Sequence, residues 1–351
     1  MTKRKCVIWQ DYNKISVVNR DIPEIKDNEI LLKVESCAIC GSDLRIFKYG
    51  NSRVQSGQII GHEISGIITQ AGSKVNKFQV NDRVSVGADV PCGNCIYCKS
   101  GKPNCCDINY AIGHQFEGGF AQYMILNELT VNLGPVHKIS DNINYNEASL
   151  AEPLACCING FERAFVKENS NIVIFGAGPI GIMLAMLANS ISSKNIIIID
   201  PQDNRLEIAK KIINNIHIIN PEKENSIKKL YQITDDFGAD FIFTACPSID
   251  AQKEAIEMVA KRGVINLFGG LPKDSSRLSF YSNLIHYKEA YITGSHGSTP
   301  KQHKKAVELI ESGKIDVSSL ITHEYSIDNI EEAYKTAASG KAVKVIIKPN
   351  K

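Results

Sequence analysis

At positions 171–181 the chain reads Asn-Ile-Val-Ile-Phe-Gly-Ala-Gly-Pro-Ile-Gly, and this stretch decides its fold class. It places a G-x-G-x-x-G pattern between a short apolar strand and a helix. Gly176 suits the tight turn, Gly178 lets the backbone approach a pyrophosphate, and Gly181 allows the helix to pack closely on the strand. The helix N-terminus, with Pro179 and Ile180, offers free N–H groups and a positive dipole end. The stretch therefore predicts a dinucleotide site.

The acid that ends the next apolar strand indicates which dinucleotide is bound. Asp200 lies nineteen residues beyond Gly181. A carboxylate at this place can accept both ribose hydroxyls of adenosine and would repel a 2′-phosphate, which favours NAD over NADP. Arg205 keeps an alternative open, because a guanidinium could bind that phosphate. The other interpretation of Arg205 is a charge on the surface of a helix.

The sequence around this motif repeats the same strand-and-helix pattern. Between most of the apolar strands lie helical patterns, for example at 179–189, 205–213 and 251–260. Apolar strands that alternate with helices indicate a parallel sheet covered on both faces, and six of them fit a doubly wound α/β fold. The six predicted strands are 172–175, 196–199, 216–219, 241–243, 264–268 and 291–293.

The remaining sequence has a different character. The first 150 residues show strand-like alternation and glycine turns, as in 30–34 and 64–68, which predicts a compact β-rich unit. After about His296 the pattern predicts two helices, 301–311 and 327–338, and a last strand, 343–347. At 351 residues the chain exceeds one typical core, so two domains are expected.

Composition excludes several classes of function. The formal net charge of +2 gives no general field for nucleic acid or an anionic membrane. Asp11, Asn13 and Lys14 interrupt the start, so it lacks the apolar stretch of a secretory signal, and the longest apolar run has only strand length. We expect a soluble, cytoplasmic protein without a nucleic-acid or membrane partner.

A group of cysteines predicts a metal site with a structural role. Five of the eleven cysteines lie within 15 residues, and in a reducing compartment such clusters bind metal more often than they form disulfides. Four thiolates can close a tetrahedral zinc site, which then has no open position for substrate. A zinc ribbon for nucleic acid is an alternative, but the flanks are not basic enough to favour it. The four expected ligands are Cys92, Cys95, Cys98 and Cys106, with Cys105 as a spare.

A second possible metal site is dispersed along the chain. Its segments are Cys37-Ala-Ile-Cys40-Gly-Ser42-Asp43, then Gly61-His62-Glu63, and later Ala151-Glu152-Pro-Leu. A cysteine, a histidine and a carboxylate would give zinc three protein ligands and leave a fourth position for a substrate oxygen. Spacing alone leaves open the alternative that His62 is a structural histidine.

Taken together, these motifs resemble the zinc-containing medium-chain alcohol dehydrogenases, and within them the sorbitol and polyol dehydrogenase branch. The zinc signature at 61–63, the segments 39–43 and 152–154, the cysteine group and the glycine motif occur in the family's order and cover essentially the whole chain. The resemblance implies a GroES-like catalytic domain of residues 1–153, to which 296–351 return, and a Rossmann NAD-binding domain of residues 154–295. It also implies a homodimer or homotetramer.

The resemblance assigns roles to single residues. It implies that Cys40 and His62 are ligands of a catalytic zinc, that Asp43 orients a ligand, and that Ser42 accepts the alcohol proton. The third ligand is either Glu63 or Glu152, and it would bind the zinc either directly or through a water molecule.

Two neighbours of these residues depart from the family's pattern. Many relatives carry a proton-relaying histidine three residues after the serine, where this chain has Arg45, and a permanently charged guanidinium is a poor proton carrier. Water could complete the exit route. Cys37 matches no ligand position and is expected in the core.

The expected reaction is hydride transfer between a secondary alcohol and NAD. A polyol, a cyclitol or a sugar-alcohol phosphate would suit the resemblance, and Arg45 and Lys48 could meet a phosphate or be solvated charges. The alternatives are an L-threonine 3-dehydrogenase-like enzyme, a simple secondary-alcohol dehydrogenase, a zinc-binding nucleic-acid module and a catalytically silent zinc- and NAD-binding protein.

Overall fold

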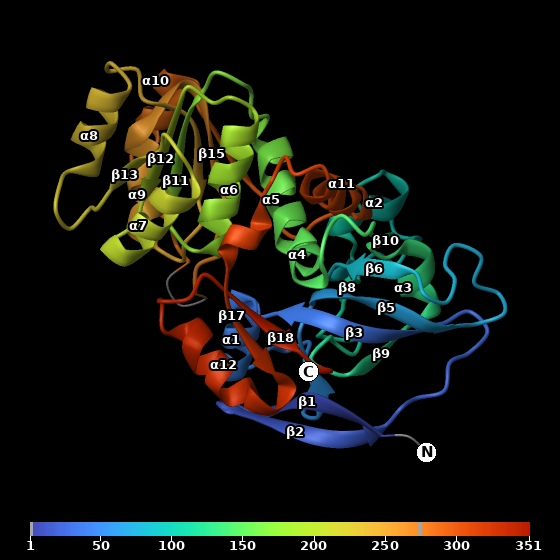
Figure 1. Cartoon of the computed structure of the whole chain (residues 1–351). Helices are drawn as coiled ribbons and strands as arrows, with labels where there is room; N and C mark the ends of the chain where they lie inside the picture. Colours follow the sequence, from blue (N-terminus) through green and yellow to red (C-terminus); the bar gives the residue numbers. More distant parts are fainter. Residues whose placement is uncertain (1–2, 273–275) are drawn as a thin grey trace. The chain divides into compact units, whose positions relative to one another are not determined.

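The computed structural model describes residues 3–272 and 276–351 (Figure 1). The chain divides into two compact units. The first unit comprises residues 1–155 and 297–351, and the second comprises residues 156–296. The boundaries expected from the sequence lie after residues 153 and 295.

The second unit is built on a parallel six-stranded sheet. The strand order is β13-β12-β11-β14-β15-β16, and every neighbouring pair is parallel. This is the order 3-2-1-4-5-6 of a doubly wound fold, so the predicted fold class is confirmed. The strands are β11 (Asn171–Phe175), β12 (Asn195–Ile199), β13 (His217–Ile219), β14 (Ala239–Thr244), β15 (Val259–Leu267) and β16 (Tyr291–Gly294).

Helices connect these strands, and two of them were missed by the pattern. The helices are α6 (Pro179–Ser190), α7 (Asp203–Ile212), α8 (Ser226–Ile233), α9 (Ile249–Met258) and α10 (Asn283–Lys288). The sequence pattern did not predict α8 or α10. The predicted helix 251–260 was wrong at its end, because Val259 already pairs with Ala239 as the first residue of β15.

The first unit is built mainly from antiparallel strands. Its larger sheet has the order β10-β6-β5-β3-β18-β17, with β9 also paired to β3, and a smaller sheet has the order β2-β1-β4. Alternate side chains of the central strands form its core, among them Ile30, Leu32, Ile64 and Ile68, none of which is exposed. The strands are β1 (Lys3–Asp11), β2 (Lys14–Asp21), β3 (Ile30–Ala38), β4 (Gln58–Ile59), β5 (Glu63–Ala71), β6 (Arg83–Val86), β7 (Asp89–Val90), β8 (Tyr110–Ala111), β9 (Tyr123–Leu126), β10 (Val136–Lys138), β17 (Ile321–Ser326) and β18 (Lys344–Lys348).

The C-terminal segment belongs to the first unit. Strand β18 pairs antiparallel with β3 and parallel with β17. The pattern missed β17, an edge strand whose middle residues are exposed, and the last helix begins after a 3₁₀ turn at Ile327–Asn329 rather than at Ile327. The remaining helices are α1 (Gly41–Tyr49), α2 (Ile96–Lys99), α3 (Glu128–Leu133), α4 (Tyr145–Ser149), α5 (Ala151–Ala164), α11 (Pro300–Glu311) and α12 (Ile330–Ala338).

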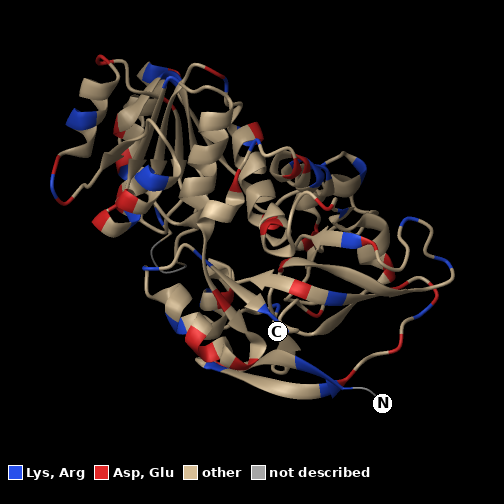
Figure 2. Ribbon diagram, in the orientation of Figure 1, with Lys and Arg blue, Asp and Glu red and all other residues tan. Residues whose placement is uncertain are grey.

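The surface carries both signs of charge. Figure 2 shows Lys and Arg interspersed with Asp and Glu over the ribbons of both units. Within residues 3–272 and 276–351, no helix is long and apolar enough to cross a membrane.

A buried histidine lies where helix α11 packs on β10. His303 is fully buried, its ring stacks on His137 with centroids 5.2 Å apart, and its Nε2 lies 3.3 Å from the Ser85 hydroxyl. Burial, together with His137, lowers the pKa of His303 well below 6.5. The imidazole is therefore neutral in the folded protein at neutral pH, and its protonation opposes folding.

Replacing His303 by glutamine is expected to weaken the loss of stability in acid. Because the folded-state pKa is lowered, the unfolded state binds the proton first, and stability from neutral His303 is present above pH 6.5 and lost below it. The difference in unfolding free energy between wild type and His303→Gln should change by about 1.4 kcal/mol per pH unit below that point. Urea unfolding at several pH values measures it, and a constant difference would contradict the assignment.

Candidate active site

Strand pairing in the first unit brings together two segments of the dispersed motif. Strands β3 and β5 run antiparallel, with Ala38 opposite Glu63. Cys40 follows the end of β3 by two residues, and His62 directly precedes β5. Because antiparallel neighbours place the end of one strand beside the start of the other, Cys40 and His62 meet at this edge of the sheet.

The side chains at this edge form a compact donor group. One ligand atom each from Cys40, His62 and Glu63 lies within 4.8 Å of the other two. The buried Asp43 carboxylate accepts a hydrogen bond from the Cys40 backbone N–H at 2.9 Å, and its other oxygen lies 3.5 Å from His62 Nδ1. The second ring nitrogen, Nε2, lies 3.2 Å from the Ser42 hydroxyl. Asp43 thus faces one side of the imidazole and leaves Nε2 for another partner.

The electrostatics of this group favour a cation. Burial alone would lower the pKa of His62, but Asp43 and Cys40 raise it well above 6.5. The pKa of the buried Glu152 carboxyl is raised to about 7, mainly by burial and also by the charge of Glu63. The same surroundings that hold a proton on His62 would favour a metal ion there. A thiol, an imidazole and a carboxylate form a donor set that suits zinc.

A buried lysine that the sequence analysis missed completes the group. Lys344, at the start of β18, donates hydrogen bonds to both carboxylate oxygens of Glu63, at 2.5 Å to Oε1. Burial would lower the pKa of Lys344, but Glu63 and Cys40 raise it, so the ammonium stays charged. The only signal in the sequence was a lysine near the start of the predicted strand 343–347, and a lysine at the end of a strand is also typical of a solvated charge.

The other predicted site residues lie in different surroundings. Glu152 is 5% exposed, but its carboxylate is not part of the group within 4.8 Å. Arg45 is exposed on α1, and Lys48 lies over the neighbouring Tyr49 ring, 5.2 Å from its centroid. Cys37 is fully buried in the core.

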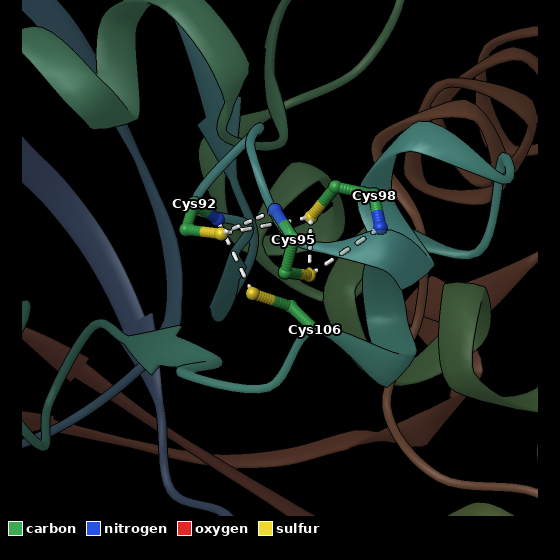
Figure 3. A group of neighbouring side chains, drawn as sticks. All are labelled: Cys92, Cys95, Cys98 and Cys106. Carbon is green, nitrogen blue, oxygen red and sulfur yellow. Dashed lines mark hydrogen bonds between the residues drawn. The ribbon is translucent and has the colours of Figure 1, made fainter.

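The four predicted cysteines lie together in one loop. Figure 3 shows the side chains of Cys92, Cys95, Cys98 and Cys106 pointing toward one another. The sulfur atoms of Cys95 and Cys98 are 3.5 Å apart, and those of Cys92 and Cys98 are 4.0 Å apart. Tetrahedral zinc with Zn–S bonds of about 2.3 Å would place its sulfur ligands about 3.8 Å apart. The loop geometry therefore fits a four-thiolate zinc ion, while Cys105 is exposed.

Replacing Cys98 by serine is expected to remove one zinc ion per chain and to destabilise the loop. Ile96 and Tyr97, the apolar neighbours of Cys98, are exposed, so hydrophobic packing does little to hold this loop. Bonds to the metal would therefore supply most of the energy that keeps the loop folded. Elemental analysis should show one zinc in place of two, with faster proteolysis of residues 92–106. The matched control is Cys105→Ser, which should keep both ions. Two zinc ions in the Cys98→Ser variant would contradict this assignment.

The glycine motif of the second unit has the geometry of a phosphate-binding turn. Gly176 has a φ of +105°, which side chains rarely adopt, and a Cβ at Gly181 would lie 1.8 Å from the Gly176 carbonyl oxygen. A Cβ at Gly178 would meet nothing within 4 Å. Pro179 and Ile180 then begin α6. The turn, the close packing and the open position match the roles of the three glycines.

Asp200 lies beside this turn. Its two carboxylate oxygens accept hydrogen bonds from the backbone N–H groups of Ala177 and Gln202, each at 2.8 Å. An ionised carboxylate has about four lone-pair sites, so each oxygen can still accept another donor. Arg205 lies in the first turn of α7, whereas Asp200 directly follows the end of β12.

The chain is similar to known proteins over almost its whole length. Residues 26–137 match the alcohol dehydrogenase GroES-like domain, and residues 179–312 match the zinc-binding dehydrogenase domain. D-arabitol-phosphate dehydrogenase of Enterococcus avium is 31% identical over 345 residues, which cover 97% of this chain and 95% of that protein. Sorbitol dehydrogenase of Bacillus subtilis is 32% identical over 355 residues, which cover 99% and 98%.

A solved structure shows the same fold. It comes from Sinorhizobium meliloti, is described as a zinc-binding dehydrogenase bound to NADP, and is 26% identical, with a TM-score of 0.92 over 99% of this chain and 100% of that one. The chain thus belongs to the zinc-binding alcohol dehydrogenase family, and it is an oxidoreductase. The family and fold predicted from the motifs are confirmed.

Proposed function

We propose that this protein transfers a hydride between a secondary alcohol of a polyol, cyclitol or sugar alcohol, phosphorylated or free, and NAD. The observation that carries the proposal is the group of Cys40, half-buried, with the buried His62 and Glu63, in which one ligand atom from each lies within 4.8 Å of the others. The full-length relatives named for arabitol phosphate and sorbitol support a polyhydroxylated substrate.

In this proposal each residue of the site has a defined task. Cys40 and His62 would hold a catalytic zinc ion, which would supply Lewis-acid polarisation of the substrate oxygen. Asp43 fixes the ring of His62 through Nδ1, and Ser42, 3.2 Å from Nε2, takes the alcohol proton. Arg45 is exposed and cannot relay that proton, so we assign its exit to water.

The two glutamates are assigned different positions. A Glu63 oxygen belongs to the compact donor group, which supports Glu63 as the direct third ligand. Glu152 lies outside that group and is assigned a contact through water. Zinc content tests this assignment, because Glu63→Gln should lose the catalytic ion more readily than Glu152→Gln does.

The dinucleotide is assigned as NAD. Asp200 is 4% exposed and lies at the turn that carries Gly176 and Gly178, where its carboxylate would meet the adenosine ribose. A 2′-phosphate would be repelled there. The Sinorhizobium meliloti structure carries NADP. NADP is therefore the alternative cofactor for this chain, with the Arg205 guanidinium as the group that would bind its 2′-phosphate.

The experiment that tests the function follows NADH formation at 340 nm. The panel contains polyols, cyclitols, sugar-alcohol phosphates, threonine and simple secondary alcohols, each with NAD or NADP and with or without a chelator. Chelator-sensitive turnover of a polyhydroxylated group with NAD supports the proposal. Turnover of threonine alone favours a threonine dehydrogenase, and turnover of simple alcohols alone favours a simple secondary-alcohol dehydrogenase. Binding of zinc and NAD without any turnover favours a catalytically silent binding protein.

We also propose that the protein is a homodimer that works in the cytoplasm. Edge strand β16 pairs only with β15 among the described residues, and the exposed Tyr291 and Ile292 lie on it. Two copies could join these edges around a two-fold axis. None of the eleven cysteines, all of which lie among the described residues, forms a disulfide, which suits a reducing compartment. Light scattering should give twice the chain mass, and a smaller mass for Ile292→Lys.

A further inference from the structure

The turn at residues 111–116 lies directly beside the segment that carries His62. Gly113 has a φ of +76°, and a Cβ on it would lie 3.0–3.2 Å from the backbone atoms of Gly61. Backbone hydrogen bonds hold the turn and the residues that follow it: Ile112 N–H donates to the Ala88 carbonyl at 3.0 Å, and Gly119 N–H donates to the Gly61 carbonyl at 2.9 Å. The turn is therefore fixed against the proposed zinc site.

Side-chain hydrogen bonds also hold the same turn. Gln115 Oε1 accepts from the Ala111 backbone N–H and from the Arg53 guanidinium, each at 3.1 Å. Arg53 also donates to the Asn109 carbonyl. A turn held by both backbone and side-chain hydrogen bonds can place a side chain with little freedom, as a binding site requires.

The side chain that this turn places beside the site is His114. Its ring centroid lies 6.2 Å from that of His62, with the two planes tilted by 56°. His114 Nδ1 lies 3.5 Å from the Ile112 carbonyl oxygen, which can only accept, so Nδ1 is the protonated nitrogen in this contact. Nε2 is then a hydrogen-bond acceptor, and it has no hydrogen-bonding partner among residues 3–272 and 276–351.

We infer that His114 Nε2 accepts a hydrogen bond from a substrate hydroxyl next to the reacting one, and so selects vicinal diols and polyols over alcohols with one hydroxyl. This assignment rests on the proposed function, because it places the reacting oxygen at the Cys40–His62 group. A site built to hydrogen-bond a substrate hydroxyl discriminates against an analogue without it, because the polar group of the protein is then left unpaired. His114 is thus a specificity-determining residue.

The test compares two alcohols that differ by one hydroxyl, 2,3-butanediol and 2-butanol, with the zinc-loaded, full-length protein. His114→Ala is expected to lower kcat/KM for the diol about tenfold, mainly through KM, and to change that for 2-butanol less than about twofold. His114→Asn, whose amide oxygen can accept, should recover part of the loss. Calorimetric titration of the protein–NADH complex with the diol should show a matching, about tenfold weaker affinity.

The controls separate the failure of this assignment from that of the function. His323→Ala removes an exposed histidine of the same unit and should leave both alcohols unchanged. If His114→Ala lowers kcat/KM equally for both alcohols, or for neither, the role of His114 is overturned. The proposed function is not affected by that result. If the wild-type protein oxidises no alcohol of the panel, the proposed function fails, and this assignment fails with it.

Discussion

Replacement of His62 by alanine is expected to reduce turnover by about a thousandfold and to remove one of two zinc ions per chain. His62 is 5% exposed, and its Nε2 is the ring nitrogen on the side away from Asp43. Lewis-acid stabilisation by a bound metal ion contributes several kcal/mol to the transition state, and about 4 kcal/mol corresponds to three powers of ten in rate. Initial rates with the preferred alcohol and elemental analysis measure the two effects.

The control for this variant is His323→Ala. His323 is exposed on β17, and its ring lies next to the neighbouring Thr322 hydroxyl, so its loss should leave both rate and zinc content unchanged. The remaining ion in His62→Ala should be the one held by the four cysteines, which shows that the variant is folded. A His62→Ala protein that keeps two zinc ions and more than a tenth of the activity would show that His62 is not a zinc ligand.

The nucleotide half of the protein could be predicted from local patterns. A buried parallel strand is apolar along its whole length, as 196–199 is, and a glycine turn followed by a helix is a short-range signal. The same reasoning missed α8 and α10, and it extended α9 into β15. Strand pairing decided that boundary, because Val259 pairs with Ala239 on the adjacent strand β14. The sequence around Val259 does not show this pairing.

The active site was harder to predict from the sequence, because strand pairing assembles it from distant segments. Cys40 and His62 could be paired only through the family resemblance, since no spacing rule links positions on two strands. Lys344 and His114 were missed for different reasons. Lys344 lies 281 residues from Glu63, and it resembles a surface charge until β18 is placed beside β3. His114 lies in a turn whose position depends on backbone contacts with Gly61.

Replacement of Lys344 by methionine is expected to destabilise the protein by about 3–5 kcal/mol, because it leaves the Glu63 carboxylate buried without its partner. Both side chains are at most 3% exposed, so water cannot take over the role of the ammonium. Urea unfolding of the metal-free proteins measures the loss, because bound zinc would otherwise pair with the Glu63 carboxylate in place of the ammonium. Lys348→Met is the control on the same strand: its ammonium bonds Asn146 and is only partly buried, so that loss should stay near 1 kcal/mol.

The double variant Lys344→Met/Glu63→Gln shows whether the loss comes from the unpaired charge. A neutral amide in place of the Glu63 carboxylate carries a smaller desolvation cost, so the double variant should be more stable than Lys344→Met alone. If the two substitutions simply add, the ion pair contributes no coupling, and Lys344 stabilises the strand only by packing. A strong coupling would show that Lys344 is kept beside β3 to hold a carboxylate at the edge where Cys40 and His62 meet. An apolar residue of similar size could fill the same space but could not hold that charge.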